Sequence, residues 1–412
     1  MLKSLIQKYK TSRSLLLYFL LTYLDKVVSF ALPLSILFII RDKSLYTTVE
    51  VAFSYATIIM VVIDLGLSNY LFYGYKKSKD QEHFIRESQV YFRFLLLMYL
   101  IFSIVLFAGV GIYDETLLLL CGVIAARTLF TLYLGFYANI YRLKDNPSGV
   151  YGISLLVNTF SFLLLMLAAF SGWKHTVLYF SVPSVLLILY VCLKFLLTDL
   201  REFRFAGFIS FLSHALKFSW PIILNVLAMS YINNYAKIYA YGYLSQEETV
   251  QISYILRIGL VIQLTHSAFS SFFSKSLFMQ TDNKFNYKIF RQYNAVLLLS
   301  VGMVIGAVAG TNYFFGDEIR IRFTLSTFLL LLYIVLWCYI GYLEIYFGVM
   351  NANKRILYYS LASSLIYTIL LLAFKNIDLL KLSLCMVISA AVNLTFVVTG
   401  LYQLNILTKR EH

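Results

Sequence analysis

The feature that most constrains this chain is a series of twelve long apolar runs, which follow one another from residue 14 to residue 405. Each run holds 18 or more residues with at most one or two charges, and a helix needs about 20 apolar residues to cross a bilayer. Only 13% of the 412 residues are charged, and 60% are hydrophobic. Soluble domains do not have this composition, so we expect an all-α integral membrane protein.

The expected spanning helices cover residues 14–40, 49–73, 93–112, 116–140, 148–170, 175–197, 217–242, 250–273, 292–311, 323–348, 356–374 and 382–405. The loops between them are too short to hold a soluble domain. The basic residues 1–13 precede the first run as in a signal peptide, but this run is longer than a signal-peptide core and carries charges at its centre. We expect it to be retained as the first span.

The distribution of Lys and Arg predicts the orientation, because these residues favour cytoplasmic loops. With a cytoplasmic N-terminus, 23 of the 34 Lys and Arg fall in cytoplasmic segments and seven in external loops. This bias accounts for the net charge of +14 without nucleic-acid binding. Both termini are expected in the cytoplasm. The four Cys lie in four different spans without a C-x-x-C pair, which indicates packing residues and no metal site.

A repeated pattern divides the chain. V-x-x-S-Y occurs at residues 51–55 and again at 250–254, an offset of 199 residues that equals the six-span period. Copies separated by six spans cross the membrane in the same direction, which indicates a parallel pseudo-twofold repeat. We expect a six-helix lobe at 1–198, a cytoplasmic linker at 199–216 and a second six-helix lobe at 217–412. A two-lobed transporter with a central cavity is the leading architecture.

Seven charged residues lie inside the expected spans, where each costs about 2.5 to 3.5 kcal/mol at a helix centre. Glu344 lies near a helix end, where it can reach the interface. The basic residues come two from each half and predict a cavity of positive potential that attracts an anionic cargo, unless they form structural ion pairs. The basic residues are Lys26, Arg127, Lys237 and Arg257, and the acidic residues are Asp25, Asp64 and Glu344.

The seventh expected span carries a polar stripe at i, i+3, i+4, i+7 and i+11. Such a stripe must face protein or water. Its residues are suited to hydrogen-bonding sugars or an anionic group, and the alternative is hydrogen bonding between helices. The stripe consists of Ser230, Asn233, Asn234, Lys237 and Tyr241.

The first span places Asp25 beside Lys26, about 100° apart around the helix, so the two cannot simply face each other. Lys26 shares a stripe with Thr22 and Ser29. Asp25 and Asp64 could exchange a proton or a cation during transport, or could neutralise Arg127 or Lys26. Coupling to a proton or sodium gradient is therefore open. Pro33 can bend the helix beyond this pair.

Three motifs carry a resemblance to a known family. V-x-x-S-Y is followed by I-D-L-G-L at 63–67, L-K-F-S-W-P at 216–221 leads into the seventh span, and N-N-Y-A-K lies within it at 233–237. The chain resembles the Wzx-type polysaccharide flippases of the multidrug/oligosaccharidyl-lipid/polysaccharide exporter (MOP) superfamily. The similarity also covers chain length, span number and loop pattern. The related lipid II flippases have two further C-terminal helices.

This resemblance implies a protein that is not an enzyme. It implies transport of an undecaprenyl-diphosphate-linked oligosaccharide, such as an O-antigen repeat unit, across the bacterial inner membrane by alternating access. The family's cationic cavity would correspond to Lys26, Arg127, Lys237 and Arg257 by span and depth. Implied partners are a polymerase and a chain-length regulator.

Two other functions remain open. A membrane-embedded polymerase or ligase typically has a large external loop with catalytic Arg or His, whereas the longest external loop here lies near 312–322 and no catalytic motif is evident. A multidrug exporter of the same superfamily would favour an acidic cavity, which the four basic residues within spans disfavour.

Overall fold

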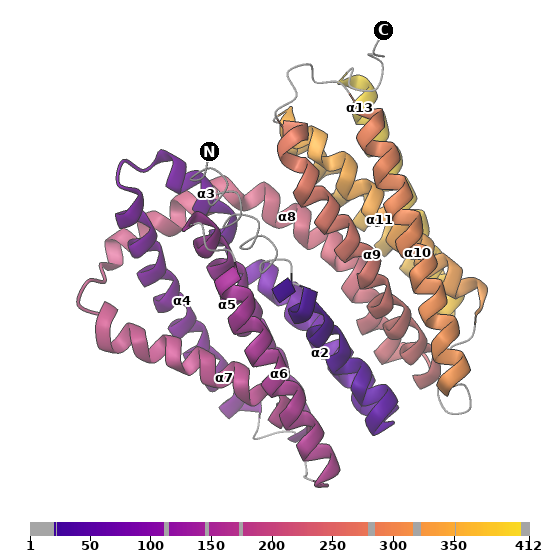
Figure 1. Cartoon of the computed structure of the whole chain (residues 1–412), viewed down its shortest axis with the longest axis horizontal. Coiled ribbons are helices and arrows are strands. Elements are labelled where there is room, and N and C mark those ends of the chain that lie inside the picture. Colours follow the sequence, from indigo (N-terminus) through magenta and orange to yellow (C-terminus); the bar gives the residue numbers. More distant parts are fainter. Residues whose placement is uncertain are drawn as a thin grey trace, which may run out of the picture. The chain divides into compact units, whose positions relative to one another are not determined.

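The computed structural model describes residues 20–21, 23–110, 115–144, 148–172, 176–278, 285–315, 323–350 and 352–404 (Figure 1). Every regular element in these ranges is helical. Eleven helices within them are long and apolar enough to cross a membrane. The predicted all-α membrane fold is therefore confirmed. The remaining predicted span, 250–273, lies within a helix that extends over Gln246–Phe278.

The chain divides into two compact units, Met1–Ile223 and Leu224–His412. The first spanning helix described in unit 1 is Tyr23–Ile40, whose last turn is the π-helix η1 (Ile36–Ile40). Its other elements are α2 (Lys43–Ile63), α3 (Leu67–Lys77), α4 (Gln81–Val110), α5 (Glu115–Leu143), α6 (Ser148–Phe170), α7 (Thr176–Lys194), η2 (Phe195–Asp199) and the first half of α8 (Phe205–Tyr243). Unit 2 holds the rest of α8, α9 (Gln246–Phe278), α10 (Tyr287–Phe315), α11 (Leu325–Val349), α12 (Asn353–Ala373) and α13 (Leu379–Gln403).

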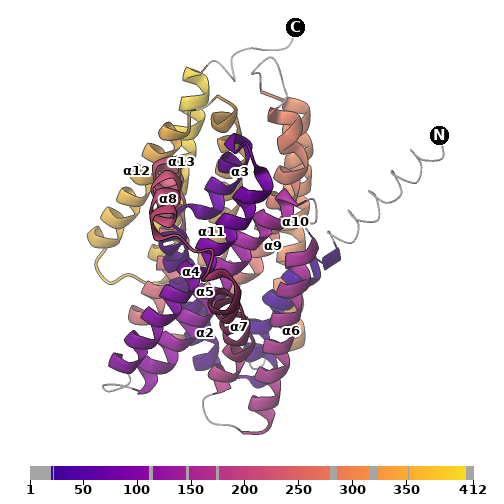
Figure 2. The ribbon, with the colours of Figure 1, turned by 90° about the vertical axis from the view of Figure 1, so that its left-hand side faces the viewer.

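The two units show the same internal order of packing. In unit 1, α2 packs on α5, α5 on α7, and α6 on α7, as Figure 2 shows for the last two pairs. In unit 2, α9 packs on α11, α11 on α13, and α12 on α13. Within the V-x-x-S-Y copies, Ser54 and Ser253 are both buried, whereas Tyr55 is 37% exposed and Tyr254 is fully buried. The lobe boundaries at 198 and 217 stay a prediction.

The second predicted span, 49–73, is wrong as a single helix. α2 begins earlier, where Asp42 caps it by accepting a hydrogen bond from the Leu45 backbone N–H at 2.9 Å, and it ends at Ile63. Leu65 and Gly66 then adopt left-handed conformations, with φ of 50° and 70°. A left-handed residue cannot continue a right-handed helix, so α3 starts anew at Leu67.

Gly66 at this break allows a close approach of α8. Ser219 Oγ donates a hydrogen bond to the Gly66 carbonyl oxygen at 2.9 Å. A Cβ atom on residue 66 would lie 2.1 Å from Ser219 Cβ, far closer than two non-bonded carbon atoms approach each other. The motifs I-D-L-G-L and L-K-F-S-W-P therefore contact each other within unit 1, and their contact is a packing feature of the fold.

Proline and aromatic residues shape two further segments. The first helix widens into η1 three residues after Pro33, whose missing N–H interrupts the hydrogen-bond ladder.

The predicted linker, residues 199–216, includes the helical start of α8. This part of α8 packs on unit 1, since the Phe211 ring meets those of Tyr70 and Tyr91 at centroid distances of 5.6 and 5.4 Å.

Candidate functional site

The buried carboxyl group of Asp25 is the centre of a polar cluster in unit 1. Asp25 is 3% exposed within the first spanning helix. Its Oδ1 accepts hydrogen bonds from Ser154 Oγ at 2.6 Å and from Asn158 Nδ2 at 2.9 Å. Ser154 and Asn158 lie one turn apart on α6, so they point to the same side. A spanning helix thus presents a carboxyl group to two neutral polar side chains.

Arg127 on α5 approaches the same side of the first helix one turn further on. Its Nη2 lies 3.4 Å from Ser29 Oγ, and Ser29 follows Asp25 by four residues. The guanidinium group lies over the Phe53 ring of α2, 4.5 Å from its centroid. A cation over an aromatic face gains about 0.5 to 2 kcal/mol, which helps to hold the guanidinium group in this position.

Lys26 points elsewhere than Asp25, as expected from their spacing. The side chain of Lys26 is exposed. The exposed apolar residues Tyr23, Leu24 and Val27 lie on a different side of the helix from Lys26. Thr22, the predicted neighbour of Lys26 in the stripe, lies outside the described residues. Among the described residues, Asp25 has hydrogen bonds but no ion pair with Lys26 or Arg127.

Asp64 is 8% exposed at the break between α2 and α3. Ser68 Oγ donates a hydrogen bond to its Oδ1 at 2.6 Å, and the Leu67 backbone N–H donates to its carbonyl oxygen at 2.9 Å. Tyr99 holds the last turn of α2 through a hydrogen bond to the Ile63 carbonyl oxygen at 2.8 Å. Asp64 therefore has a local part in ending α2, and the structure does not bring it into contact with Asp25.

Unit 2 holds the other two basic residues of the predicted cationic set. Lys237 on α8 and Arg257 on α9 are each 7% exposed, although both belong to predicted spanning segments. Within the predicted stripe, Asn234 is also 7% exposed and donates to the Ser230 carbonyl oxygen at 2.9 Å. Basic side chains within spanning helices are rare, and they commonly line a substrate pathway or pair with other polar groups.

Two other members of this stripe differ in their surroundings. Asn233 Oδ1 is buried without a hydrogen-bond partner among the described residues, whereas Tyr241 is 45% exposed. The opposite side of α8 carries a row of tyrosines at i+4 spacing, and the Tyr231 ring of that row meets the Tyr367 ring of α12 at 5.8 Å. The stripe therefore faces away from α12. The row consists of Tyr231, Tyr235, Tyr239 and Tyr243.

Sequence reasoning missed several polar residues of the spans. Ser154, Asn158 and Ser161 on α6 are at most 3% exposed and follow the spacing i, i+4 and i+7, the same criterion that revealed the stripe on α8. Glu50 in α2 is fully buried. These positions were detectable from the polar spacing and from the charge count.

Arg93 corrects the count of charges within spans. The sequence assigned it to the basic segment 76–93, but it lies in α4, is 8% exposed and pairs with Asp199. Its Nε also donates to Tyr137 Oη at 3.1 Å. Because Asp199 is 106 residues away in sequence, only the tertiary structure reveals this pair.

Glu344 and His266 lie in unit 2. Glu344 is half-buried, and one of its carboxyl oxygens is buried without a hydrogen-bond partner among the described residues, so its position at the interface stays a prediction. His266 Nδ1 lies 2.8 Å from Tyr293 Oη and joins α9 to α10. In the described part of the chain, no three His, Cys, Asp or Glu residues gather as metal ligands, and all four Cys are free.

Comparisons with known proteins relate this fold to transporters. No protein-family model and no curated protein matches the chain. Among solved structures, the chain is similar to "Lipid II flippase MurJ, inward closed conformation", with a TM-score of 0.55 and 11% identity over 94% of this chain and 87% of the other.

Two further solved structures show the same similarity. An outward-facing multidrug resistance MATE family transporter of the MOP superfamily has a TM-score of 0.55 and 13% identity, with 97% of both chains covered. The eukaryotic MATE transporter AtDTX14 has a TM-score of 0.53 and 13% identity over 94% of this chain and 93% of the other. At these identities the similarity shows the fold alone, which is the fold of these three solved structures.

Proposed function

We propose that this chain is a flippase that moves an undecaprenyl-diphosphate-linked oligosaccharide, such as an O-antigen repeat unit, across the bacterial inner membrane. The observation that carries the proposal is the burial of basic residues within spanning segments of a transporter fold. Lys237 and Arg257 are each 7% exposed in unit 2, and Arg127 is half-buried in unit 1. Guanidinium and ammonium groups in a low-dielectric site attract phosphate strongly.

The cargo's two ends have different requirements that these residues can meet. A diphosphate needs cationic donors, which Lys26, Arg127, Lys237 and Arg257 supply. Sugar hydroxyls need amide and hydroxyl partners, which Ser230, Asn233, Asn234 and Tyr241 supply. Asn233 Oδ1, buried without a partner among the described residues, is an acceptor that a sugar hydroxyl would satisfy.

Transport in this proposal proceeds by alternating access, driven by a proton or sodium gradient. Asp25 supports this coupling because its carboxyl group is buried and accepts hydrogen bonds from Ser154 and Asn158. Such a group can bind and release a cation as its exposure changes. Asp64, which ends α2, is the second candidate.

The proposed topology places both termini in the cytoplasm, because the Lys and Arg bias of the loops favours this side. A flippase in this position would work beside a polymerase and a chain-length regulator.

A multidrug exporter is the competing function within the same fold, since two of the similar structures are MATE transporters. Basic residues in the spans favour an anionic cargo over cationic drugs. A membrane polymerase or ligase is a further alternative. It is less favoured, because the similar solved structures are a flippase and two transporters.

The deciding experiment removes the protein from cells and locates the lipid-linked repeat units. Accumulation on the cytoplasmic leaflet is expected. Accumulation of single units already on the outer leaflet would indicate a polymerase, and an unchanged glycan with altered drug sensitivity would indicate a drug exporter.

A further inference from the structure

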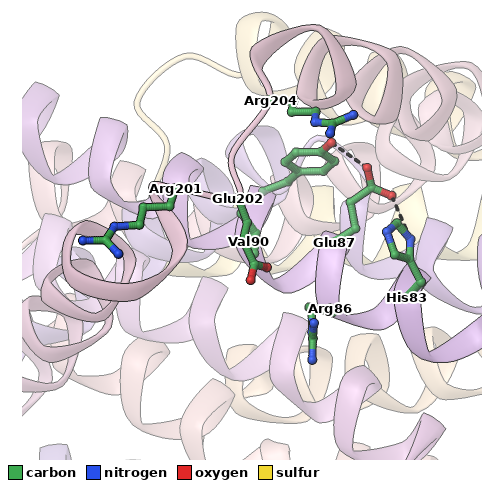
Figure 3. A pocket seen from close by; sticks show the side chains of 8 residues that line it. His83, Arg86, Glu87, Val90, Arg201, Glu202 and Arg204 are labelled. Carbon is green, nitrogen blue, oxygen red and sulfur yellow. Dashed lines mark hydrogen bonds and ion pairs between the residues drawn. The ribbon is translucent and has the colours of Figure 1, made fainter.

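A charged pocket opens at one end of unit 1, apart from the cluster around Asp25. It has a volume of about 450 Å³ and lies between the start of α4 and the turn that precedes α8. Its lining residues are His83, Arg86, Glu87, Val90, Tyr91, Arg201, Glu202 and Arg204. A second pocket of about 750 Å³ shares His83 and Arg86 with it. Figure 3 shows the side chains of Arg86, Arg201 and Arg204 on three sides of Glu202.

The three arginines of the pocket outnumber its two carboxylates. Glu87 accepts a hydrogen bond from Tyr91 Oη at 2.6 Å and lies 3.9 Å from His83 Nδ1, so its carboxylate is directed toward these two side chains (Figure 3). Within the described part of the chain, none of the three guanidinium groups takes part in an ion pair or a side-chain hydrogen bond. Three arginines and two glutamates therefore line this pocket, and the excess of positive charge makes an anion the complementary ligand.

Exposed apolar residues flank the turn that carries two of these arginines. Leu197 and Leu200 precede Arg201 and are 78% and 53% exposed, and Phe205, which follows Arg204, is 62% exposed. In a membrane protein, large apolar residues exposed at the end of a spanning helix contact lipid.

The first part of α8 continues this pattern. Ile209 and Trp220 are 48% and 46% exposed and lie on the side of α8 that carries Phe205. The exposed His214 lies opposite Phe205, and the exposed Lys217 lies between these two sides. Tryptophan favours the headgroup level of a bilayer. The helix thus has an apolar side for lipid and a polar side for water, which places the pocket at the membrane surface.

We propose that this pocket binds the phosphate headgroup of an anionic membrane phospholipid, with its acyl chains lying along Leu197, Leu200 and Phe205. Arginine matches this ligand because its planar fork donates paired hydrogen bonds to phosphate oxygens. The juxtaposition of uncompensated arginines with exposed apolar residues selects an amphiphile over a soluble anion. This proposal does not depend on the transported cargo.

The test compares lipid affinities of the purified full-length protein in detergent by native mass spectrometry. The probes are dioleoyl phosphatidylglycerol, dioleoyl phosphatidylcholine and inorganic phosphate. The pocket variant R86Q/R201Q/R204Q is matched by K288Q/R291Q/K354Q, which removes the same number of exposed positive charges from unit 2. Because all six side chains are exposed, both variants should keep the wild-type unfolding temperature.

The wild type should bind phosphatidylglycerol about tenfold more tightly than phosphatidylcholine, since each basic residue near an anionic headgroup adds attraction. The pocket variant should lose this preference and the matched variant should keep it. Leu197→Gln should weaken binding of phosphatidylglycerol.

Three outcomes would overturn the proposal. An equal loss in the matched variant would show that only diffuse surface charge attracts the lipid. Displacement of the lipid by an equal concentration of inorganic phosphate would show a soluble-anion pocket. Selective binding of a polyprenyl diphosphate without any preference for phosphatidylglycerol would make the pocket a cargo site.

Discussion

The side-chain amide of Asn158 donates a hydrogen bond to Asp25 Oδ1 at 2.9 Å and joins α6 to a carboxyl group that is 3% exposed in the first spanning helix. Ser154 donates to the same oxygen at 2.6 Å. The carboxyl group is therefore held by neutral donors, and its proposed role is to couple transport to an ion gradient.

Asp25→Asn tests whether this group couples transport to an ion gradient. The asparagine is nearly isosteric and can still accept from Ser154, but it cannot ionise. Transport in proteoliposomes should lose its dependence on an imposed proton or sodium gradient. Glu247→Gln, at an exposed position on α9, should retain it. Unchanged gradient dependence in Asp25→Asn would leave Asp25 as a structural residue.

Arg127→Ala should reduce export of the lipid-linked cargo at least about tenfold, because a charge-assisted hydrogen bond to phosphate contributes about 1.5 to 3 kcal/mol. Arg127→Lys should recover only part of the activity, since lysine lacks the planar fork that lies over Phe53. Export is measured with membrane insertion monitored in parallel. The exposed Lys375→Ala serves as the control. Full export by Arg127→Ala would remove Arg127 from the site.

Gly66→Ala should destabilise unit 1 by about 2 to 4 kcal/mol, because left-handed alanine is strained and the added Cβ would meet Ser219 Cβ at 2.1 Å. Gly152→Ala, where nothing lies within 4 Å, should lack this clash. The unfolding temperature in detergent reports both. Ser219→Gly combined with Gly66→Ala should recover the loss of stability that the clash causes. The loss caused by the positive φ of residue 66 should remain. Equal unfolding temperatures for Gly66→Ala and the wild type would contradict the close approach of α8.

Asp199→Leu should lower the free energy of unfolding by about 3 kcal/mol, because it leaves Arg93 buried without its counter-charge. The double variant Arg93→Met/Asp199→Leu should lower the free energy of unfolding by only about 1 kcal/mol. This figure includes the lost hydrogen bond from Arg93 Nε to Tyr137 Oη. Unfolding by SDS titration would measure the double-mutant cycle. Additive losses would show that the two side chains are not coupled.

The sequence by itself determined the fold class and the approximate spans, because a bilayer demands about 20 apolar residues for each crossing and leaves few alternatives to helices. It also identified Asp25, Lys26, Arg127, Lys237 and Arg257, since any charge inside an apolar run stands out. The spacing on α6 that holds Ser154 and Asn158 was visible in the same way.

Tertiary structure decided which residues meet. Asp25 finds Ser154 and Asn158 across 129 and 133 residues, and Gly66 meets Ser219 across 153. Hydropathy is a local property of the chain, whereas these contacts depend on how helices pack. The break at Leu65 and Gly66 was hidden for a related reason: an apolar run marks where the chain lies in the bilayer, and left-handed residues within it do not change its hydropathy.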